Sequence, residues 1–375
     1  MPKMTDAVKR EAFIRLHQNK DELNSDEQLV CDEINERLRY VPHKKLYKFR
    51  KCSPRNFRTL EENCIWMAPG KDFHDPTDST INIDFKRNGK QIEEWLKDNQ
   101  AALAFAFAKS LCEKLGVEMP YSYALFLEYA AACLDTKGAV NELKEADFLR
   151  AHATQEELQQ MDQLLLSLQQ IRQTFDQQEA NFTNMFADAI DNMRTTMRNK
   201  SIIYCMTEGC DNSSLWENYA DTYRGFCIEY SFEAFNSQSF EVYKNLAYLF
   251  PMTYRVRKPY FDMVPLIKGF FGELFTGDTS WQQDSAINAD LNMQLYYKRK
   301  EYEFEHEWRF VLSDKFENKQ YFPFVSALYA GKDIKPGNLR RLCGIARKLN
   351  VPVYKQVLNR TNNGFKYEIV QEANR

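Results

Sequence analysis

The spacing of apolar residues changes twice along this chain, and that change limits the folds it can adopt. Before about residue 88 and again after about residue 200, short segments alternate apolar and polar residues, as strands with one buried face do. Between 90 and 199 the spacing is helical, and no Gly or Pro interrupts residues 154–199. The pattern predicts an α+β protein with a mixed sheet core that is interrupted by a large helical insertion.

These changes of spacing also predict the division of the chain. We expect N-terminal helices at 1–40, a mixed α+β core domain formed by 41–88 and 200–375, and a helical insertion at 89–199. The expected strands of the core are 46–50, 64–68, 202–207, 226–232, 252–256, 301–312, 324–328, 353–358 and 366–370. The apolar segment 266–275 fits either a helix or a strand.

Residues 154–199 carry the clearest periodic signal. Thr154 and Glu157 form a capping box, and apolar residues then follow a heptad-like spacing from Leu158 to Met193. We expect one long helical arm here. It either packs as an antiparallel arm on helices at 91–116 and 121–134, or binds a second copy or another partner.

Charge and cysteine content exclude several classes of protein. The formal net charge is −3, so no global field draws the chain onto nucleic acid or an anionic membrane. The nine cysteines form no CxxC pair, so we expect neither a disulfide framework nor a bound metal. No apolar stretch is long enough for a membrane span, and the charged first residues lack an apolar signal segment, so we expect a cytoplasmic protein.

The segment from 301 to 310 alternates charged with aromatic residues or histidine. On a strand, Arg309 would share one face with four carboxylates, which are Glu301, Glu303, Glu305 and Glu307. Glu301 and Glu303 suit a solvent-facing surface. Glu305 and Glu307 stand beside Trp308, where the strand should enter the core, and a buried carboxylate needs a partner or a raised pKa. We therefore expect Glu305 and Glu307 to be functional.

Two further segments are candidates for binding. Asp75 and Asp78 flank Pro76 in a short loop, where they either cap backbone amides or point outward toward a ligand. Trp216 and Tyr219 precede the segment 225–230, and their rings either fill the core or form the wall of a cleft.

Five segments, in order, resemble a bacterial family described only as a domain of unknown function. They are Leu46–Arg50, Asp75–Asp78, Thr207–Tyr219, Gly225–Tyr230 and Glu305–Arg309, followed by a similar tail that includes Val353–Lys355. The resemblance spans about 46 to 370 without the helical insertion. Because some members resemble effectors of bacterial defence loci, it implies such a role here.

The order of the elements also looks like that of ADP-ribosyltransferases. This looser resemblance implies NAD as the substrate, with Lys48 or Arg50 on its adenosine or phosphate side. Glu307 would then bind the nicotinamide ribose and stabilise oxocarbenium character, with Glu305 as its companion. Cys205–Thr207 stands where that superfamily usually has Ser-Thr-Ser, and Lys48 stands where His is commoner.

Three functions remain open from the sequence. The first is NAD-dependent transfer or NAD breakdown, with Asp75, Asp78 and Arg309 as further substrate-binding residues beside a cleft that is formed by Tyr47, Lys48, Arg50, Trp216, Tyr219 and Glu307. The second is a metal-dependent nuclease that uses Asp75, Asp78, Glu305 and Glu307, since clustered carboxylates bind Mg²⁺. The third is a non-catalytic interaction protein that acts through the arm.

We predict that residues 154–199 mediate self-association as a homodimer, because their heptad stripe carries more apolar surface than a free helix should expose. Light scattering at micromolar protein concentration should give the mass of a dimer. A monomeric mass under those conditions would contradict the prediction.

Overall fold

The computed structural model describes residues 3–73, 75, 77–84, 87–91, 94, 100–133, 145–359 and 364–373. The chain forms two compact units. The core unit comprises Met1–Thr80, Thr195–Pro259 and Leu291–Arg375, and the second unit comprises Ile81–Arg194 and Tyr260–Asp290. The second unit thus includes residues 260–290, which sequence analysis assigns to the core domain.

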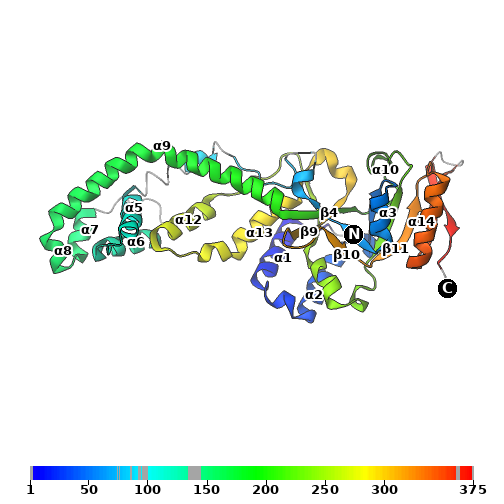
Figure 1. Cartoon of the computed structure of the whole chain (residues 1–375), viewed down its shortest axis with the longest axis horizontal. Helices are drawn as coiled ribbons and strands as arrows, with labels where there is room; N and C mark the ends of the chain where they lie inside the picture. Colours follow the sequence, from blue (N-terminus) through cyan, green and yellow to red (C-terminus); the bar gives the residue numbers. More distant parts are fainter. Residues whose placement is uncertain are drawn as a thin grey trace. The chain divides into compact units, whose positions relative to one another are not determined.

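A mixed sheet organises the core unit (Figure 1). Its strands run in the order β13-β12-β11-β5-β1-β4-β9-β6, and β3 joins β4. Only the β11–β12 pair is parallel within this sheet. The strands are β1 (Lys45–Arg50), β3 (Ala68–Pro69), β4 (Ser201–Thr207), β5 (Phe226–Ser231), β6 (Leu249–Pro251), β9 (Glu307–Ser313), β11 (Val325–Ala330), β12 (Val353–Asn359) and β13 (Gly364–Gln371). The predicted α+β class with a mixed sheet is therefore confirmed.

Four short strands form two smaller sheets. β2 (Cys64–Trp66) pairs with β10 (Lys319–Tyr321), and β7 (Thr253–Arg255) pairs in parallel with β8 (Tyr297–Arg299). The single strand predicted at 64–68 is therefore wrong, because β2 and β3 pair with different partners on either side of Met67.

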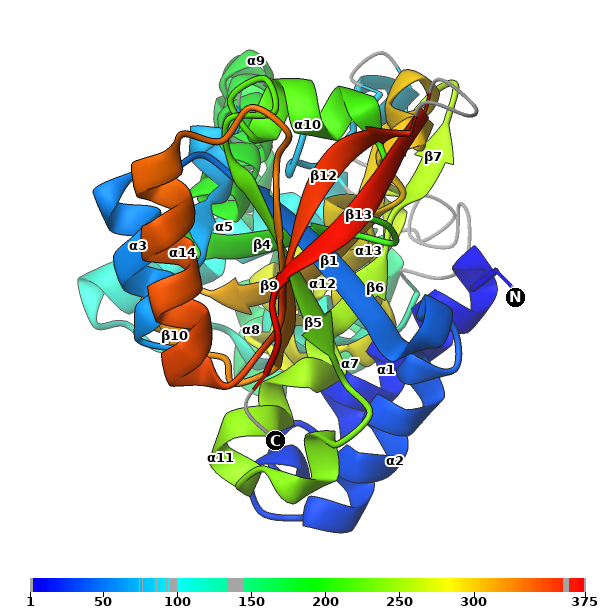
Figure 2. The same ribbon diagram turned by 90° about the vertical axis from the view of Figure 1, so that its right-hand side faces the viewer.

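Helices cover both faces of the large sheet. Phe226 and Cys227 are consecutive on β5, so their side chains point to opposite faces. Phe57 of α3 stacks on Phe226 with ring centroids 5.4 Å apart, whereas Trp216 of α10 belongs to the hydrophobic cluster around Cys227. Figure 2 shows α3 beside α14 on one side of the strands. The α-helices of the core unit include α1 (Asp6–Gln18), α2 (Glu27–Leu38), α3 (Pro54–Glu61), α10 (Ser213–Tyr219), α11 (Phe240–Tyr243) and α14 (Pro336–Leu349).

Short 3-10 helices connect these elements. In the core unit they are η1 (Glu22–Asn24), η2 (Pro42–Lys44), η3 (Gly70–Asp72), η4 (Phe235–Ser237), η5 (Lys244–Tyr248), η7 (Gln294–Tyr296) and η8 (Lys300–Glu305). The last of these, η8, is separated from β9 by His306 alone and contains one of the predicted site residues, Glu305.

The described part of the second unit is mainly helical. Its elements are α5 (Gln100–Leu115), α6 (Tyr121–Ala132), α7 (Glu145–His152), α8 (Gln155–Gln159), most of α9 (Met161–Lys200), α12 (Val264–Thr276), η6 (Ser280–Gln283) and most of α13 (Ser285–Met293). Phe126 of α6 contacts Phe105 of α5 and Phe148 of α7, with ring centroids 4.4 and 5.4 Å apart. The ambiguous segment 266–275 is thus helical, within α12.

The predicted arm is two helices rather than one. Thr154 and Glu157 form the expected capping box at α8, but Gln160 ends that helix and α9 begins at Met161. Leu158 is exposed, and several side chains of the predicted heptad stripe, among them Leu165 and Phe175, lie outside the described residues. Among the helices that can be described, none is long and apolar enough to span a membrane.

Gly225 allows β1 and β5 to approach each other closely. A Cβ atom at this position would lie 2.2 Å from the carbonyl oxygen of Arg50 and 2.8 Å from that of Ala220. Both neighbours are backbone atoms, so neither can move without disturbing the sheet. We expect Gly225→Ala to lower the free energy of unfolding by about 2 kcal/mol or more, measured by urea denaturation.

Gly337→Ala is the matched control for this prediction. Gly337 lies in α14, where a Cβ atom would meet no other atom within 4 Å, and Ala favours a helix over Gly. We expect that variant to unfold at an equal or higher urea concentration. Equal stability of both variants would refute the steric argument at Gly225.

Candidate functional site

A fully buried arginine organises the predicted site residues. Arg309 of β9 donates from Nε to Glu307 Oε1 (2.6 Å). Its Nη1 and Nη2 donate to the two carboxylate oxygens of Asp78, at 2.7 Å each. Nη1 also donates to the carbonyl of Leu295 (2.8 Å) and to Ser79 Oγ (3.2 Å). This bidentate geometry is the strongest way to pair a carboxylate with a cation, and it fixes the loop around Asp78 against β9.

Glu307, the first residue of β9, is bound at both carboxylate oxygens. Arg309 occupies Oε1, and Lys298 Nζ donates to Oε2 (2.7 Å). The backbone N–H of Glu307 donates to the Tyr254 hydroxyl (2.7 Å). Burial acts to raise the pKa of Glu307, but the charges of Arg309 and Lys298 hold it well below its usual value. Glu307 is therefore a fixed anion.

Glu305 is held less tightly. Its Oε2 accepts a hydrogen bond from Lys298 Nζ (2.5 Å), and its Oε1 accepts one from the Tyr219 hydroxyl (3.1 Å). Burial raises the pKa of Glu305, and the negative charge of Glu307 adds to that effect against the pull of Lys298. The two neighbouring carboxylates thus have pKa values that are shifted in opposite directions.

The predicted strand from 301 to 312 is wrong in its first half. Residues 300–305 form η8, His306 has the left-handed φ of 42°, and β9 begins only at Glu307. The reason is the partner strand, because Thr207 ends β4 and pairs with Glu307. Glu305 and Glu307 still converge on Lys298, whereas Glu301 is exposed and pairs with Arg299.

Lys298 is the central residue that sequence reasoning missed. It lies in the short strand β8, and its ammonium group bridges Glu305 and Glu307. Burial acts to lower its pKa, but the charge of Glu307 and then that of Glu305 raise it above its usual value, so it stays protonated. Nothing in the local pattern distinguishes this lysine from its basic neighbours. We call Asp78, Lys298, Glu305, Glu307 and Arg309 the carboxylate cluster.

Lys48 and Arg50 project from β1 over Tyr204 of the neighbouring strand β4, and Lys48 is also close enough to Glu305 and Glu307 for their charges to act on it. Their charged groups stand over the ring of Tyr204, at 5.1 and 5.2 Å from its centroid. Burial, together with the charge of Arg50, lowers the pKa of Lys48 to about 8, while nearby acidic groups act in the opposite direction. The first-strand cations therefore face an aromatic ring.

Three other predicted residues make their side-chain contacts outside the cluster, although the backbone carbonyl of Asp75 accepts a hydrogen bond from the N–H of Asp78 (3.1 Å). Tyr47 donates to Glu229 Oε2 (3.2 Å). Trp216 is fully buried and packs edge-on against Phe49, with ring centroids 5.0 Å apart, so its ring fills the core. Asp75 pairs with the exposed Arg299 at 3.3 Å.

The structure thus brings together five of the predicted site residues, which are Asp78, Tyr219, Glu305, Glu307 and Arg309. It places Tyr47, Lys48, Arg50, Asp75 and Trp216 in other contacts. His74 and Pro76, which belong to the predicted loop, lie outside the described residues.

Glu229 is a buried carboxylate outside the cluster that also has several partners, on a segment that sequence analysis noted only for its motif. Besides Tyr47, it accepts hydrogen bonds from Tyr329 (2.7 Å) and Ser326 Oγ (2.7 Å), and it pairs with Lys45 at 3.0 Å. Burial acts to raise its pKa, but these hydrogen bonds hold it below the usual value. Its contacts on both oxygens indicate a structural anion.

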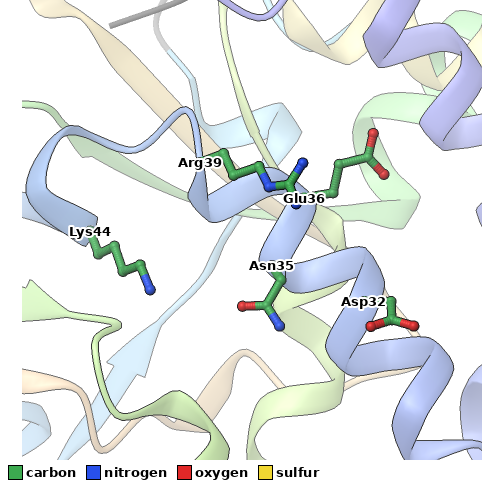
Figure 3. Close-up of a pocket in the computed structure, with 5 residues that line it drawn as sticks. All are labelled: Asp32, Asn35, Glu36, Arg39 and Lys44. Carbon is green, nitrogen blue, oxygen red and sulfur yellow. The ribbon is translucent and has the colours of Figure 1, made fainter.

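A hollow of about 560 Å³ lies beside α2 (Figure 3). Its walls carry two acidic and two basic side chains, together with one amide, and they are Asp32, Asn35, Glu36, Arg39 and Lys44. The opposite charges cancel, so the hollow offers no net field for an ion. We therefore place the candidate site at the carboxylate cluster.

Carboxylates predicted as metal ligands are instead paired with cationic side chains. Arg309 takes both oxygens of Asp78, and Lys298 bridges Glu305 and Glu307. Within the described part of the chain, no group of three or more His, Cys, Asp or Glu side chains is arranged to hold a metal ion.

Part of the site lies in a segment that matches a family model. Residues 215–310 match the model of a family described as "Protein of unknown function (DUF2971)". The matched segment includes Tyr219, Lys298, Glu305, Glu307 and Arg309, and it confirms the resemblance to an uncharacterised family. No curated protein and no solved structure matches the chain.

Removing Arg309 should leave two buried carboxylates without their main cation. We expect Arg309→Met to lower the free energy of unfolding by about 3–5 kcal/mol at pH 7. The folded-state pKa values of Asp78 and Glu307 are lowered, so their stabilisation is present above the unfolded pKa of about 4 and is lost as the pH falls further. The difference in unfolding free energy between wild type and variant should therefore be largest at neutral pH and should become smaller below about pH 4.

Urea denaturation across this pH range measures the effect. Arg299→Met is the matched control, because Arg299 is half exposed and ion pairs at the surface add little to stability. A deficit for Arg309→Met that does not vary with pH would contradict the electrostatic explanation.

Proposed function

We propose that this protein is an enzyme in which Glu305 exchanges a proton with its substrate while Glu307 remains ionised. One observation carries the proposal, namely two adjacent carboxylates that share one lysine and have oppositely shifted pKa values. In many enzymes such a pair divides the work, because the raised carboxylate transfers protons and the lowered one supplies fixed charge.

Glu305 is the member of the pair with the weaker contacts, although both carboxylates are buried. Both oxygens of Glu307 are engaged by charged donors, so a ligand would have to displace Arg309 or Lys298 to reach it. One oxygen of Glu305 instead meets the neutral hydroxyl of Tyr219, a residue that is 47% exposed. A water molecule or a substrate hydroxyl can replace that single contact. This geometry favours Glu305, with Glu307 as a positioning residue, over the main role for Glu307 that sequence analysis assigns.

The resemblance to ADP-ribosyltransferases supports NAD as the substrate. In that reaction the bond between C1′ of the ribose and the nicotinamide nitrogen breaks, and its electron pair leaves with neutral nicotinamide. Water or an acceptor hydroxyl forms the new bond to C1′, and its proton passes to Glu305. When ionised, Glu305 and Glu307 supply negative charge from adjacent positions. That charge suits a positive oxocarbenium-like transition state.

The remaining predicted residues have roles in the same proposal. Lys48 and Arg50 supply positive charge on β1 for the diphosphate of NAD. Tyr219 keeps its proton, because burial and the charge of Glu305 raise its pKa, so it can donate to Glu305 or to a ribose oxygen. Turnover of NAD would suit an effector of bacterial defence, the role that the family resemblance implies.

We predict that Glu305→Gln lowers the rate of NAD turnover by about 10²-fold or more, the scale on which a lost general base acts. The amide keeps the shape of the side chain but cannot accept the proton. NAD consumption and transfer of labelled ADP-ribose should be measured with water, protein and nucleic acid as acceptors. The wild-type rate should rise with pH as Glu305 loses its proton, and the variant should lack that rise.

Glu301→Gln is the matched control, since Glu301 lies in the same short helix and is 58% exposed. It should leave the rate unchanged, and thermal melting of both variants should match the wild type. No turnover by the wild type with any acceptor would overturn the NAD assignment. Equal rates for wild type and Glu305→Gln would remove Glu305 from the chemistry.

A further inference from the structure

The last strand of the large sheet leaves one edge open. β13 pairs along its inner edge with β12, in a register that joins Gln356 to Tyr367 and Leu358 to Phe365. It stands at the end of the strand order, so no strand covers its outer edge among the residues that the structure describes (Figure 2). An open edge of this length presents backbone N–H and C=O groups that can pair with another strand.

The side chains of β13 are exposed and differ between its two faces. Phe365 and Ile369, which are 40% and 50% exposed, lie on the same face as Tyr367. The opposite face carries Lys366 and Glu368, which form an ion pair at 2.8 Å along the strand and are both exposed. One face of β13 therefore exposes two apolar side chains, and the other face exposes one positive and one negative side chain.

We propose that β13 pairs with β13 of a second copy of this chain, antiparallel about a two-fold axis at Tyr367. In this register Lys366 of each copy lies opposite Glu368 of the other, which makes two ion pairs on one face. Phe365 lies opposite Ile369 of the second copy twice on the other face. Opposite charges and apolar pairs placed directly across an antiparallel ladder stabilise it.

The charges select this register over its neighbours. Antiparallel strands related by a two-fold axis place residues of the same face opposite one another, so the register can shift only in steps that preserve the face. An axis at Lys366 would place that lysine opposite its own copy, and an axis at Glu368 would do the same for the glutamate. Like charges directly opposite destabilise a pair of strands. The axis at Tyr367 avoids both contacts.

A charge-swap experiment on the full chain tests the proposal. Sedimentation equilibrium should give a concentration-dependent dimer for the wild type. Lys366→Glu alone, or Glu368→Lys alone, places like charges opposite at both ion pairs and should raise the dissociation constant by about tenfold or more. The double variant Lys366→Glu/Glu368→Lys restores opposite charges and should bring the dissociation constant back to nearly the wild-type value.

Lys319→Glu on β10 makes the same change of net charge on another exposed strand and should leave the dimer intact. Amide hydrogen exchange in β13 should slow as the protein concentration rises. A wild type that stays monomeric at high micromolar concentration would overturn the proposal. So would a dimer that both single reversals leave unchanged, which would assign association to another surface such as residues 154–199. Failure of the double variant to regain association would overturn the register.

Discussion

The geometry of the core unit at its candidate site depends on one guanidinium group. Arg309 is fully buried and joins β9 to the loop at Asp78 and to the backbone at Leu295, three segments that are separate in sequence. Moving such a group out of water is costly unless every donor finds a partner. Its bidentate contact with Asp78 and its bond to Glu307 meet that requirement, so the position of each carboxylate is set by the arginine.

Once Glu307 is fixed in this way, the ionised form of the neighbouring Glu305 is stabilised less. Lys298 cannot neutralise Glu305 and Glu307 equally, because Arg309 already favours ionised Glu307. Burial therefore leaves the pKa of Glu305 raised, whereas that of Glu307 is lowered. The remaining contact of Glu305 is the Tyr219 hydroxyl. A structural requirement of the core thus produces the chemical asymmetry on which the proposed function rests.

The sequence predicts the sheet well where each strand is paired along its length. β1, β4 and β5 lie within one residue of the strands expected at 46–50, 202–207 and 226–232, although almost every residue of β4 and β5 is buried. Arg309 shares a face with Glu307 as the alternation requires. The alternation before Glu307 misleads, because a strand also needs a partner and β4 ends at Thr207. Lys298 could not be found, since its role depends on a parallel contact between two short strands that no local pattern indicates.

The pairing of Asp78 with Arg309 has a consequence for the order of events during synthesis. The two residues are 231 positions apart, and the whole of the second unit lies between them in the sequence. At ribosomal rates, roughly 10–50 s separate the emergence of the aspartate from that of its arginine. Throughout that interval the Asp78 loop lacks the cation that allows its burial, so it stays hydrated. The candidate site therefore assembles only after β9 has been synthesised, and a shorter nascent chain lacks the Asp78–Arg309 pair.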